Sequence, residues 1–204
     1  MMKIVLATHN HNKLREFREI FSSALSGETK EPLEIISLTD IGFFDEIEET
    51  GTTFEENALI KARAAASLGY ITISDDSGLE VDALHGEPGI YSARYGGDKC
   101  ADDKERYEYL LKNMENVPEG KRSARFVSVI TCTFPDGREV VARGEIEGEI
   151  LRAPIGEGGF GYDPIFFVPS EGMTTAEMSA ERKNEISHRA RSLQIMSKKL
   201  KEIL

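Results

Sequence analysis

Apolar and polar residues change their spacing several times along this chain, and these changes predict its elements. An apolar run at residues 4–7 is typical of a buried strand, and a polar stretch at residues 8–12 follows it. From Lys13 onward the apolar positions recur with helical spacing, which predicts a first helix. Short apolar runs predict two more strands, at residues 34–38 and 71–73.

Two Thr-x-x-Glu pairs stand directly before an alanine-rich stretch, and they predict a capped helix over about residues 54–67. Helical spacing also predicts a helix over residues 101–114 and a closing helix over residues 187–204. Residues 125–134, a Pro-Asp-Gly turn and a returning strand from Glu139 predict a hairpin.

The last part of the pattern is a glycine-rich loop at residues 156–161 and a short apolar strand at residues 164–168. Helices alternate with strands in the first half of the chain, whereas a β-meander dominates the second half. The pattern therefore predicts an α/β fold with a mixed central β-sheet flanked by helices, not a purely parallel sheet.

Length, charge and cysteine content narrow the function. The 204 residues suit one domain, residues 1–204, or one core with two lobes. A net charge of −11 argues against nucleic acid as a partner, because such affinity comes largely from neutralised phosphates. The apolar start is too short for a membrane span. Cys100 and Cys132 lack metal-ligand spacing, which favours two reduced thiols in a cytoplasmic protein.

Thr8, Asn10 and Lys13 lie at the predicted junction between the first strand and the first helix. The unpaired backbone N–H groups of a helix N-terminus suit a phosphate, and Lys13 adds a cation. The chain has no glycine-rich phosphate loop of the G-x-x-x-x-G-K-[ST] type. The alternative is that Asn10 or Asn12 only caps the helix and that Lys13 is solvated.

Asp75 and Asp76 come directly after the third predicted strand. Ligands of α/β sheets gather beyond the carboxyl ends of the strands, and two carboxylates there can hold Mg²⁺. A carboxylate can also activate a water molecule as a general base. A polar turn is the alternative for this pair. Glu49 is a further carboxylate source, for which a solvated acidic loop is the alternative.

Two more polar clusters lie in the second half of the chain. Glycines flank Phe160, so that Phe160 or Tyr162 can stack on a flat ligand and Asp163 can accept from a ring N–H. The alternative is a glycine-rich turn with core aromatics. Lys183 and Ser187-His188-Arg189 mark the start of the closing helix. Cations there oppose the helix dipole, which favours binding of an anion or an oxo group over a surface imidazole.

In their order along the chain, these clusters resemble the inosine triphosphate/xanthosine triphosphate pyrophosphatase family. The resemblance spans nearly the whole chain, and each motif is weak alone but specific in combination. The matching stretches are residues 5–10 with Lys13, 48–51 with scattered positions up to 62, 74–79, 88–94, 159–166 and 187–189.

This resemblance implies an elongated, two-lobed α/β domain with the active site in a cleft between the lobes. It implies a homodimer that requires Mg²⁺ and acts on purine nucleoside triphosphates. The implied reaction is hydrolysis of ITP, dITP and XTP between the α- and β-phosphates. The products would be a monophosphate and pyrophosphate, so that deaminated nucleotides leave the nucleotide pool.

The resemblance also implies roles by position. Asp76 would be the base that activates water, and Glu49 and Asp76 would bind Mg²⁺. The residues implied to bind substrate are Thr8, His9, Asn10, His11, Asn12, Lys13, Lys61 and Ser77 on the phosphate side, and Phe160, Gly161, Tyr162, Asp163, Lys183, His188 and Arg189 on the base side.

Two other functions stay open at this level. A Maf-type nucleoside triphosphate pyrophosphatase would share a related fold but prefer other bases. A nucleotide-binding module would sense a triphosphate without cleaving it. The acidic pair speaks against such a module, because carboxylates weaken the binding of an anion unless a metal intervenes.

Overall fold

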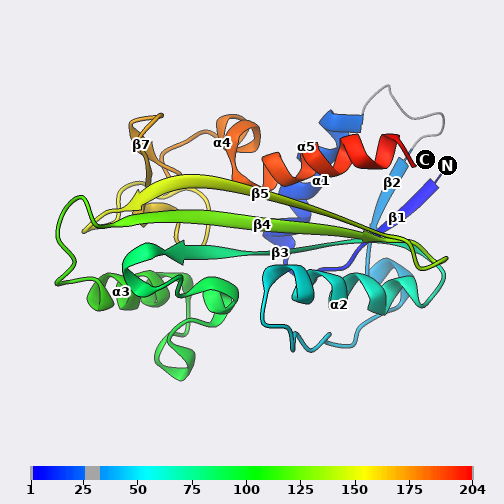
Figure 1. The fold of residues 1–204 in the computed structure, drawn as a ribbon, viewed down its shortest axis with the longest axis horizontal. Coiled ribbons are helices and arrows are strands. Elements are labelled where there is room, and N and C mark those ends of the chain that lie inside the picture. Colours follow the sequence, from blue (N-terminus) through cyan, green and yellow to red (C-terminus); the bar gives the residue numbers. More distant parts are fainter. Residues whose placement is uncertain (1, 26–32, 204) are drawn as a thin grey trace. The chain divides into compact units, whose positions relative to one another are not determined.

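The structure is a computed structural model that describes residues 2–25 and 33–203. Among these residues, seven strands form one sheet in the order β2-β1-β3-β4-β5-β6-β7 (Figure 1). The strands are β1 (Met2–Leu6), β2 (Leu33–Ser37), β3 (Ile71–Val81), β4 (Ser123–Thr133), β5 (Glu139–Ile150), β6 (Phe166–Val168) and β7 (Met173–Thr174).

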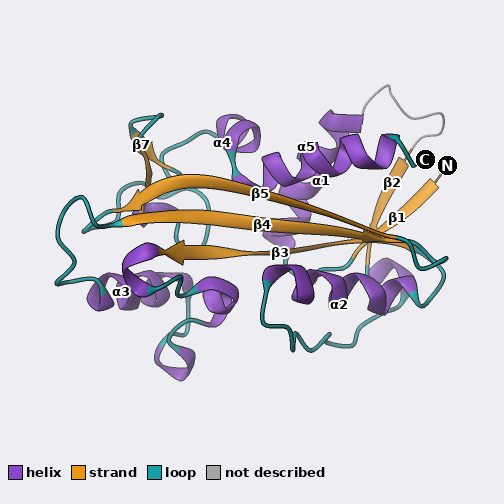
Figure 2. Ribbon diagram, viewed as in Figure 1, coloured by secondary structure: helices purple, strands orange, loops and turns teal. Residues whose placement is uncertain are grey.

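Helices accompany these strands, as Figure 2 shows. The α-helices are α1 (His11–Leu25), α2 (Phe54–Ala66), α3 (Asp103–Asn113), α4 (Ala180–Ile186) and α5 (His188–Lys201). None of the helices in the described ranges combines the length and the apolar character that crossing a membrane requires.

The sheet is mixed, as the sequence predicts. Strand β1 pairs in parallel with β2 and with β3, whereas β6 pairs antiparallel with β5 and with β7. The predicted hairpin is present as β4 and β5, joined by a turn in which Gly137 N donates to Phe134 O at 2.9 Å. The α/β fold with a mixed sheet is therefore confirmed.

Several predicted boundaries are wrong in an informative way. Strand β3 does not stop at residue 73 but continues to Val81. Helix α4 was not predicted, because seven residues are too few to display a helical period. The closing helix ends at Lys201 instead of residue 204, and Ile203 beyond it is 38% exposed.

The chain divides into two compact units. Unit 1 comprises residues 1–76, 128–144 and 189–204, and unit 2 comprises residues 77–127 and 145–188. Each unit has its own buried core. The two lobes and the cleft implied by the family resemblance stay a prediction.

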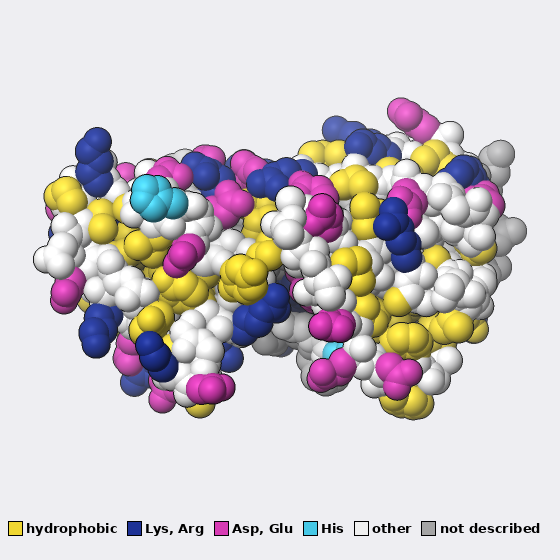
Figure 3. All heavy atoms as spheres, turned by 60° about the horizontal axis from the view of Figure 1, so that its bottom comes forward, with side chains coloured by type: hydrophobic (Ala, Val, Ile, Leu, Met, Phe, Trp, Pro, Cys, Tyr) yellow, Lys and Arg dark blue, Asp and Glu magenta, His cyan; other side chains and the backbone are white. Residues whose placement is uncertain are grey.

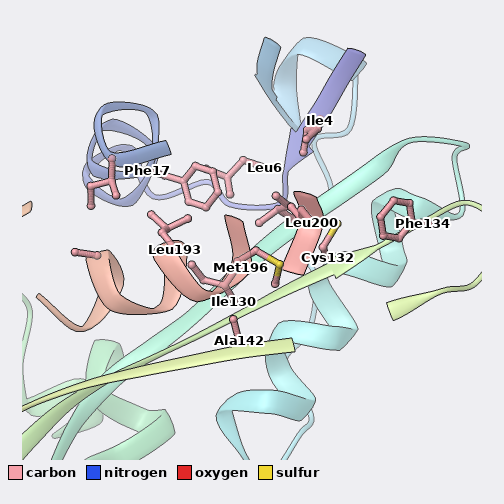
Figure 4. Packing of buried hydrophobic residues seen from close by; sticks show 13 residues of the cluster. Ile4, Leu6, Phe17, Ile130, Cys132, Phe134, Ala142, Leu193, Met196 and Leu200 are labelled. Carbon is pink, nitrogen blue, oxygen red and sulfur yellow. The ribbon is translucent and has the colours of Figure 1, made fainter. Parts of the chain in front are cut away.

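The core of unit 1 packs both faces of β1. Ile4 and Leu6 point to one face, where α1 and α5 cover them, and Figure 4 shows Phe17 and Leu193 in this cluster. Val5 and Ala7 point to the other face and pack with Ala65 of α2. The alternation follows from the two-residue period of a strand, and it explains why the run 4–7 is apolar throughout.

The core of unit 2 is built from β3, β4, β5 and α3. Leu79 and Leu110 are fully buried in it, and the rings of Phe126 and Phe166 lie 4.4 Å apart between centroids. Helix α3 begins at a sequence-encoded cap, because the Asp102 side chain accepts from Glu105 N. The two leucines and the two phenylalanines form part of the buried core of unit 2.

The surface mixes charges of both signs. On the face drawn in Figure 3, Lys and Arg side chains stand among Asp and Glu side chains. The net charge of −11 is thus not balanced by one broad basic field on that face. A site for an anion on that face must therefore rely on a local group of cations.

The packing of α5 predicts a contrast within one helix. Leu193 is fully buried and Ile195 is 38% exposed. We expect Leu193→Ala to lower the free energy of unfolding by about 3 kcal/mol, through lost burial and a residual cavity. Ile195→Ala is the control and should change it by about 0.5 kcal/mol or less. Urea unfolding measures both, and equal losses would contradict the assigned packing.

Candidate functional site

Strand β3 carries the two adjacent carboxylates Asp75 and Asp76. The pairing of β1 with β3 ends at Leu6 and Ile73, so both acids lie just past the end of β1. They are not in a turn, because β3 continues through them. Successive side chains of a strand point to opposite faces, and the two acids therefore meet different neighbours.

Asp75 is buried on the face that packs against α1 and α5. Its Oδ2 lies 3.0 Å from Nζ of Lys13 and 3.2 Å from Nη2 of Arg189. Its Oδ1 accepts a 2.7 Å hydrogen bond from Ser128 Oγ, which comes from β4. One carboxylate therefore joins a cation of α1, a cation of α5 and a hydroxyl of the neighbouring strand.

Arg189 is fully buried and also pairs with Glu16 of α1. The family resemblance groups Arg189 with the base, but the structure places its guanidinium against Glu16 and Asp75. Sequence reasoning missed Glu16. Its position three residues after Lys13 on one helix was the available signal, because residues spaced by three share a helix face.

The charges around Asp75 affect the pKa of its carboxyl more than burial does. Burial alone would raise the pKa of this carboxyl, but the charges of Arg189 and Lys13 and the Ser128 hydrogen bond lower it far below its usual range. For Arg189, burial opposes the charged form, and Asp75 and Glu16 nevertheless raise its pKa. Both groups are therefore charged at neutral pH.

Asp76 points to the opposite face, toward α2. Nζ of Lys61 lies 3.0 Å from Asp76 Oδ1 and 2.9 Å from Glu49 Oε1, so that one ammonium bridges two carboxylates. Burial lowers the pKa of Lys61, but Asp76 and Glu49 raise it by more. The family resemblance assigns all three residues to one site, and the structure brings them together.

Local sequence explains how α2 presents Lys61. Thr53 caps the helix by accepting from Glu56 N, and the Glu56 side chain accepts in turn from Thr52 N at 2.6 Å. Gly51 N donates to Asn57 Oδ1 at 2.8 Å, which ties the segment after Glu49 to the helix. The predicted cap thus sets the start of α2, the helix that carries Lys61. The Gly51 hydrogen bond keeps the segment after Glu49 next to this helix.

The second oxygen of Asp76 has no hydrogen-bond partner among the described residues, although it is buried. Burial raises the pKa of Asp76, and Glu49 adds to the rise, while Lys61 and Lys13 oppose it. Lys13 is therefore close enough to act on both acids of β3. A buried oxygen without a partner is costly, and it marks a place where a ligand atom would be stabilising.

Glu49 and Asp76 fit a divalent cation that keeps some of its water. The described part of the chain holds no group of three or more Asp, Glu, His or Cys side chains arranged around one point. Two carboxylates suit Mg²⁺ better than Zn²⁺, because Mg²⁺ is commonly held by one or two carboxylates together with waters and substrate phosphates.

We call Asp75, Asp76 and the five charged side chains linked to them the β3 charge cluster. The five are Lys13, Glu16, Glu49, Lys61 and Arg189. Three cations and four carboxylates leave this cluster with one net negative charge. A divalent cation bound there would make the cluster positive, which an anionic ligand requires.

The polar segment before α1 is organised by its own side chains. Asn10 Oδ1 accepts from Lys13 N at 3.1 Å and so caps the helix, and Thr8 Oγ1 accepts from Asn10 N at 3.1 Å. His9 is exposed, with its Nε2 at 3.4 Å from Asp45 O. The alternative of a capping asparagine is thus confirmed, but Lys13 is not solvated, since it pairs with Asp75. The side chains of His11 and Asn12 lie outside the described residues.

Unit 2 contains a second polar group, the Asp163 cluster of Phe160, Asp163, Thr175 and Lys183. Asp163 Oδ2 lies 2.7 Å from Lys183 Nζ and accepts from Phe160 N at 2.9 Å. Asp163 Oδ1 accepts from Thr175 Oγ1 at 2.9 Å. Lys183 Nζ stands 4.8 Å from the centroid of the Phe160 ring. Asp163 therefore holds an aromatic ring and a cation together, and it does not offer a free carboxylate.

Only glycine fits at position 159 of this loop. Its φ is +75°, and a Cβ there would lie 1.9 Å from Asp163 Oδ2. Gly159 thus lets the backbone approach the Asp163 carboxylate closely. Thr175 was missed by sequence reasoning, since no local pattern links it to a residue twelve positions earlier.

The other base-side residues have varied surroundings in unit 2. Tyr162 is buried in the core, and its hydroxyl donates to Ser92 O at 2.8 Å. Phe160, by contrast, is half-buried. Gly161 N donates to Asp103 Oδ2 at 2.8 Å. The His188 ring stacks on Phe126 with 5.0 Å between centroids and 20° between planes.

Ser77 follows Asp76 on β3 and is half-buried. It belongs to unit 2, whereas Asp76 closes a segment of unit 1. Its assignment to the phosphates stays a prediction.

The contacts of Asp75 predict a large effect on stability. We expect Asp75→Asn to lower the free energy of unfolding by about 3–5 kcal/mol at pH 7, because it leaves the buried Arg189 and the half-buried Lys13 with one carboxylate fewer. Asp136→Asn makes the same chemical change at an exposed turn and should cost about 0.5 kcal/mol or less. Urea unfolding compares the two, and a small loss for Asp75→Asn would show that Asp75 does not hold the cluster together.

Comparison with known sequences adds independent information. The model of the Ham1 family matches residues 4–199. A protein of Listeria monocytogenes named dITP/XTP pyrophosphatase is 48% identical over 205 residues, covering 100% of this chain and 97% of its own length. A protein of Shigella flexneri with the same name is 48% identical over 199 residues and covers 96% of both chains.

Solved structures agree with the sequence comparison. The Ham1 protein of Staphylococcus aureus is 43% identical with a TM-score of 0.85 and covers 99% of this chain and 100% of its own. The HAM1 protein of Coxiella burnetii is 42% identical with a TM-score of 0.87 and the same coverage. A family match over most of the chain and full-length relatives at this identity leave one conclusion: the chain belongs to the Ham1 family.

Proposed function

We propose that this protein hydrolyses deaminated purine nucleoside triphosphates, such as dITP, ITP and XTP, to the monophosphate and pyrophosphate. The single observation that carries the chemistry is the β3 charge cluster, in which two carboxylates with an unpartnered oxygen stand beside lysines. The names of the full-length relatives carry the substrate class. In a cell, this reaction would remove damaged nucleotides from the nucleotide pool.

The phosphates are assigned to the cationic part of the β3 charge cluster. A triphosphate carries about four negative charges, and its transfer chemistry depends mainly on positioning and charge neutralisation. Lys13 and Lys61 are the mobile cations of the cluster, and Asp75 orients the first of them. Backbone N–H groups at the start of α1 add neutral donors.

Asp76 is the proposed general base. Its pKa is raised by burial, so its carboxylate is a better proton acceptor than an ordinary aspartate. As the water oxygen bonds to the α-phosphorus, a proton of this water passes to Asp76. The bond between the α- and β-phosphates breaks, with pyrophosphate as the leaving group. No side-chain nucleophile is needed for this step.

Glu49 and Asp76 are the proposed Mg²⁺ ligands. Their fit rests on the unpartnered Oδ2 of Asp76, on the hard oxygen donors and on the net negative charge of the cluster. A bound Mg²⁺ would neutralise phosphate charge and hold the triphosphate against the two carboxylates. The protein's own part is to keep these two carboxylates close together.

The Asp163 cluster and His188 are the proposed contacts for the base. Lys183 and a ring N–H of His188 are donors that favour the 6-oxo group of hypoxanthine or xanthine, and Phe160 supplies a ring for stacking. Adenine would point an amino group at these donors and leave them unpaired, at about 1–3 kcal/mol per buried group. Two such mismatches correspond to about a hundredfold or more in selectivity.

The Maf-type alternative is not favoured, because the full-length relatives are named dITP/XTP pyrophosphatases. A purely sensing module is disfavoured by the two carboxylates, which weaken anion binding unless a metal intervenes. We also propose, from the family resemblance, a homodimer that works in the cytoplasm. Light scattering tests the dimer through its mass in solution.

Product analysis tests the proposed function directly. We expect dITP with Mg²⁺ to yield phosphate only when inorganic pyrophosphatase is added, because the first product is pyrophosphate. Chelation of the metal with EDTA should abolish turnover. The rate with dATP should be lower than the rate with dITP by about a hundredfold or more. Phosphate released without the helper enzyme would contradict cleavage between the α- and β-phosphates.

Substitution of the proposed base tests the mechanism. We expect Asp76→Asn to lower kcat by about 10²–10⁴-fold, because the amide cannot accept the proton. Nucleotide binding, followed by isothermal titration, should survive. Asp136→Asn serves as the matched control, since this exposed turn residue pairs with Arg138 and lies outside the β3 charge cluster. A wild-type rate for Asp76→Asn would remove Asp76 from the mechanism.

A further inference from the structure

Lys61 occupies an unusual position for a residue assigned to phosphates. Its ammonium lies 2.9 Å from Glu49 and 3.0 Å from Asp76, and the residue is only 8% exposed. These two carboxylates are the ones proposed to bind Mg²⁺. The same oxygen atoms are therefore offered to two different cations.

The two cations cannot share the carboxylates without a penalty. A lysine ammonium and a divalent ion repel each other, and the repulsion is strong where water is largely excluded. Each ammonium bond also uses an oxygen lone pair that a metal would need. Binding of the metal and retention of both Lys61 contacts therefore oppose each other.

The carboxylate pair is not saturated by Lys61. Asp76 Oδ2 is buried and lacks a hydrogen-bond partner among the described residues, and Asp76 itself is only 5% exposed. If Lys61 were a purely structural partner, a complete set of bonds to Asp76 would be expected, since orphaned buried oxygens are rare. An open oxygen beside a bridging ammonium instead points to a second cation.

Lys61 can leave without disturbing its helix. The backbone of α2 is held next to β3, because Ala58 O accepts from Ser74 Oγ, and its first turn is held by the Thr53 cap. A lysine ammonium stands on four flexible methylene groups, so it can move while the helix stays in place.

We propose that Lys61 is a built-in counter-cation, which neutralises Glu49 and Asp76 in the metal-free protein and yields them when a divalent cation binds. The released ammonium then becomes available to the phosphates. This inference rests on the proposed function, because it takes the two carboxylates as the metal site. It adds a defined order: Lys61 moves from the acids to the substrate only when the metal is loaded.

The test is metal affinity without any nucleotide. Mn²⁺ alone is titrated into the full-length protein at pH 8 and constant ionic strength, and free Mn²⁺ is counted by its electron paramagnetic resonance signal. Lys61→Met keeps the apolar stem but removes the competing charge. We expect its dissociation constant for Mn²⁺ to be at least tenfold lower than that of the wild type.

Arg63→Met is the matched control. It removes a cation of the same helix, α2, that is 58% exposed and pairs with Glu139, outside the β3 charge cluster. We expect it to change Mn²⁺ affinity less than threefold. Equal gains for both variants would reveal only a general field effect and would overturn the proposal. An unchanged or weaker affinity of Lys61→Met, or no Mn²⁺ binding by any variant, would also overturn it.

A second measurement uses the wild-type protein and does not depend on the folding of a variant. The ¹⁵N–¹H resonance of the Lys61 ammonium, assigned by its loss in Lys61→Arg, should shift or broaden when Mg²⁺ is added. A resonance that stays unchanged at saturating Mg²⁺ would overturn the proposal. Because neither measurement uses a nucleotide, a failure here is distinguishable from a failure of the product analysis with dITP.

Discussion

The β3 charge cluster depends on the ion pairs made by two neighbouring carboxylates, Asp75 and Asp76, on opposite faces of β3. Asp75 faces Lys13 and Arg189, and Asp76 faces Lys61 and Glu49. The period of two in a strand separates them by a single peptide bond and yet gives them unrelated partners. One acid therefore pairs with two cations, while the other keeps a buried oxygen without a hydrogen-bond partner among the described residues.

The energetic cost of this arrangement explains its connectivity. Buried charges lose hydration, and an ion pair in the interior seldom adds net stability compared with an apolar pair of similar size. In this chain the buried charges are instead linked: Arg189 joins Glu16 to Asp75, and Asp75 joins Arg189 to Lys13. Such linkage makes each charge costly to remove. It also restricts where the Lys13 ammonium can lie.

Asp163 repeats the principle in unit 2. Its carboxylate is engaged by Lys183, by Phe160 N and by Thr175, so its role is to set the positions of a ring and an ammonium. The donors that a 6-oxo purine would meet are then prearranged, and little ordering is left for the moment of binding. A base with an amino group in place of the 6-oxo group would bring a hydrogen-bond donor against the donors of the protein. In this account selectivity comes from fixed donors more than from pocket size.

The sequence by itself determined the mixed α/β fold, the capped helix α2, the hairpin of β4 and β5, and the family, because periodicity, caps and turns act over a few residues and motifs recur in order. It also singled out Asp76, Lys61 and Lys183 as chemically important. Only the tertiary structure decided that β3 continues through its acids, that Arg189 pairs with Glu16 and Asp75, and that Thr175 binds Asp163. The physical reason is that the partner of a buried charge is chosen by packing: Glu16 and Arg189 are 173 positions apart, and no local pattern encodes a contact at that separation.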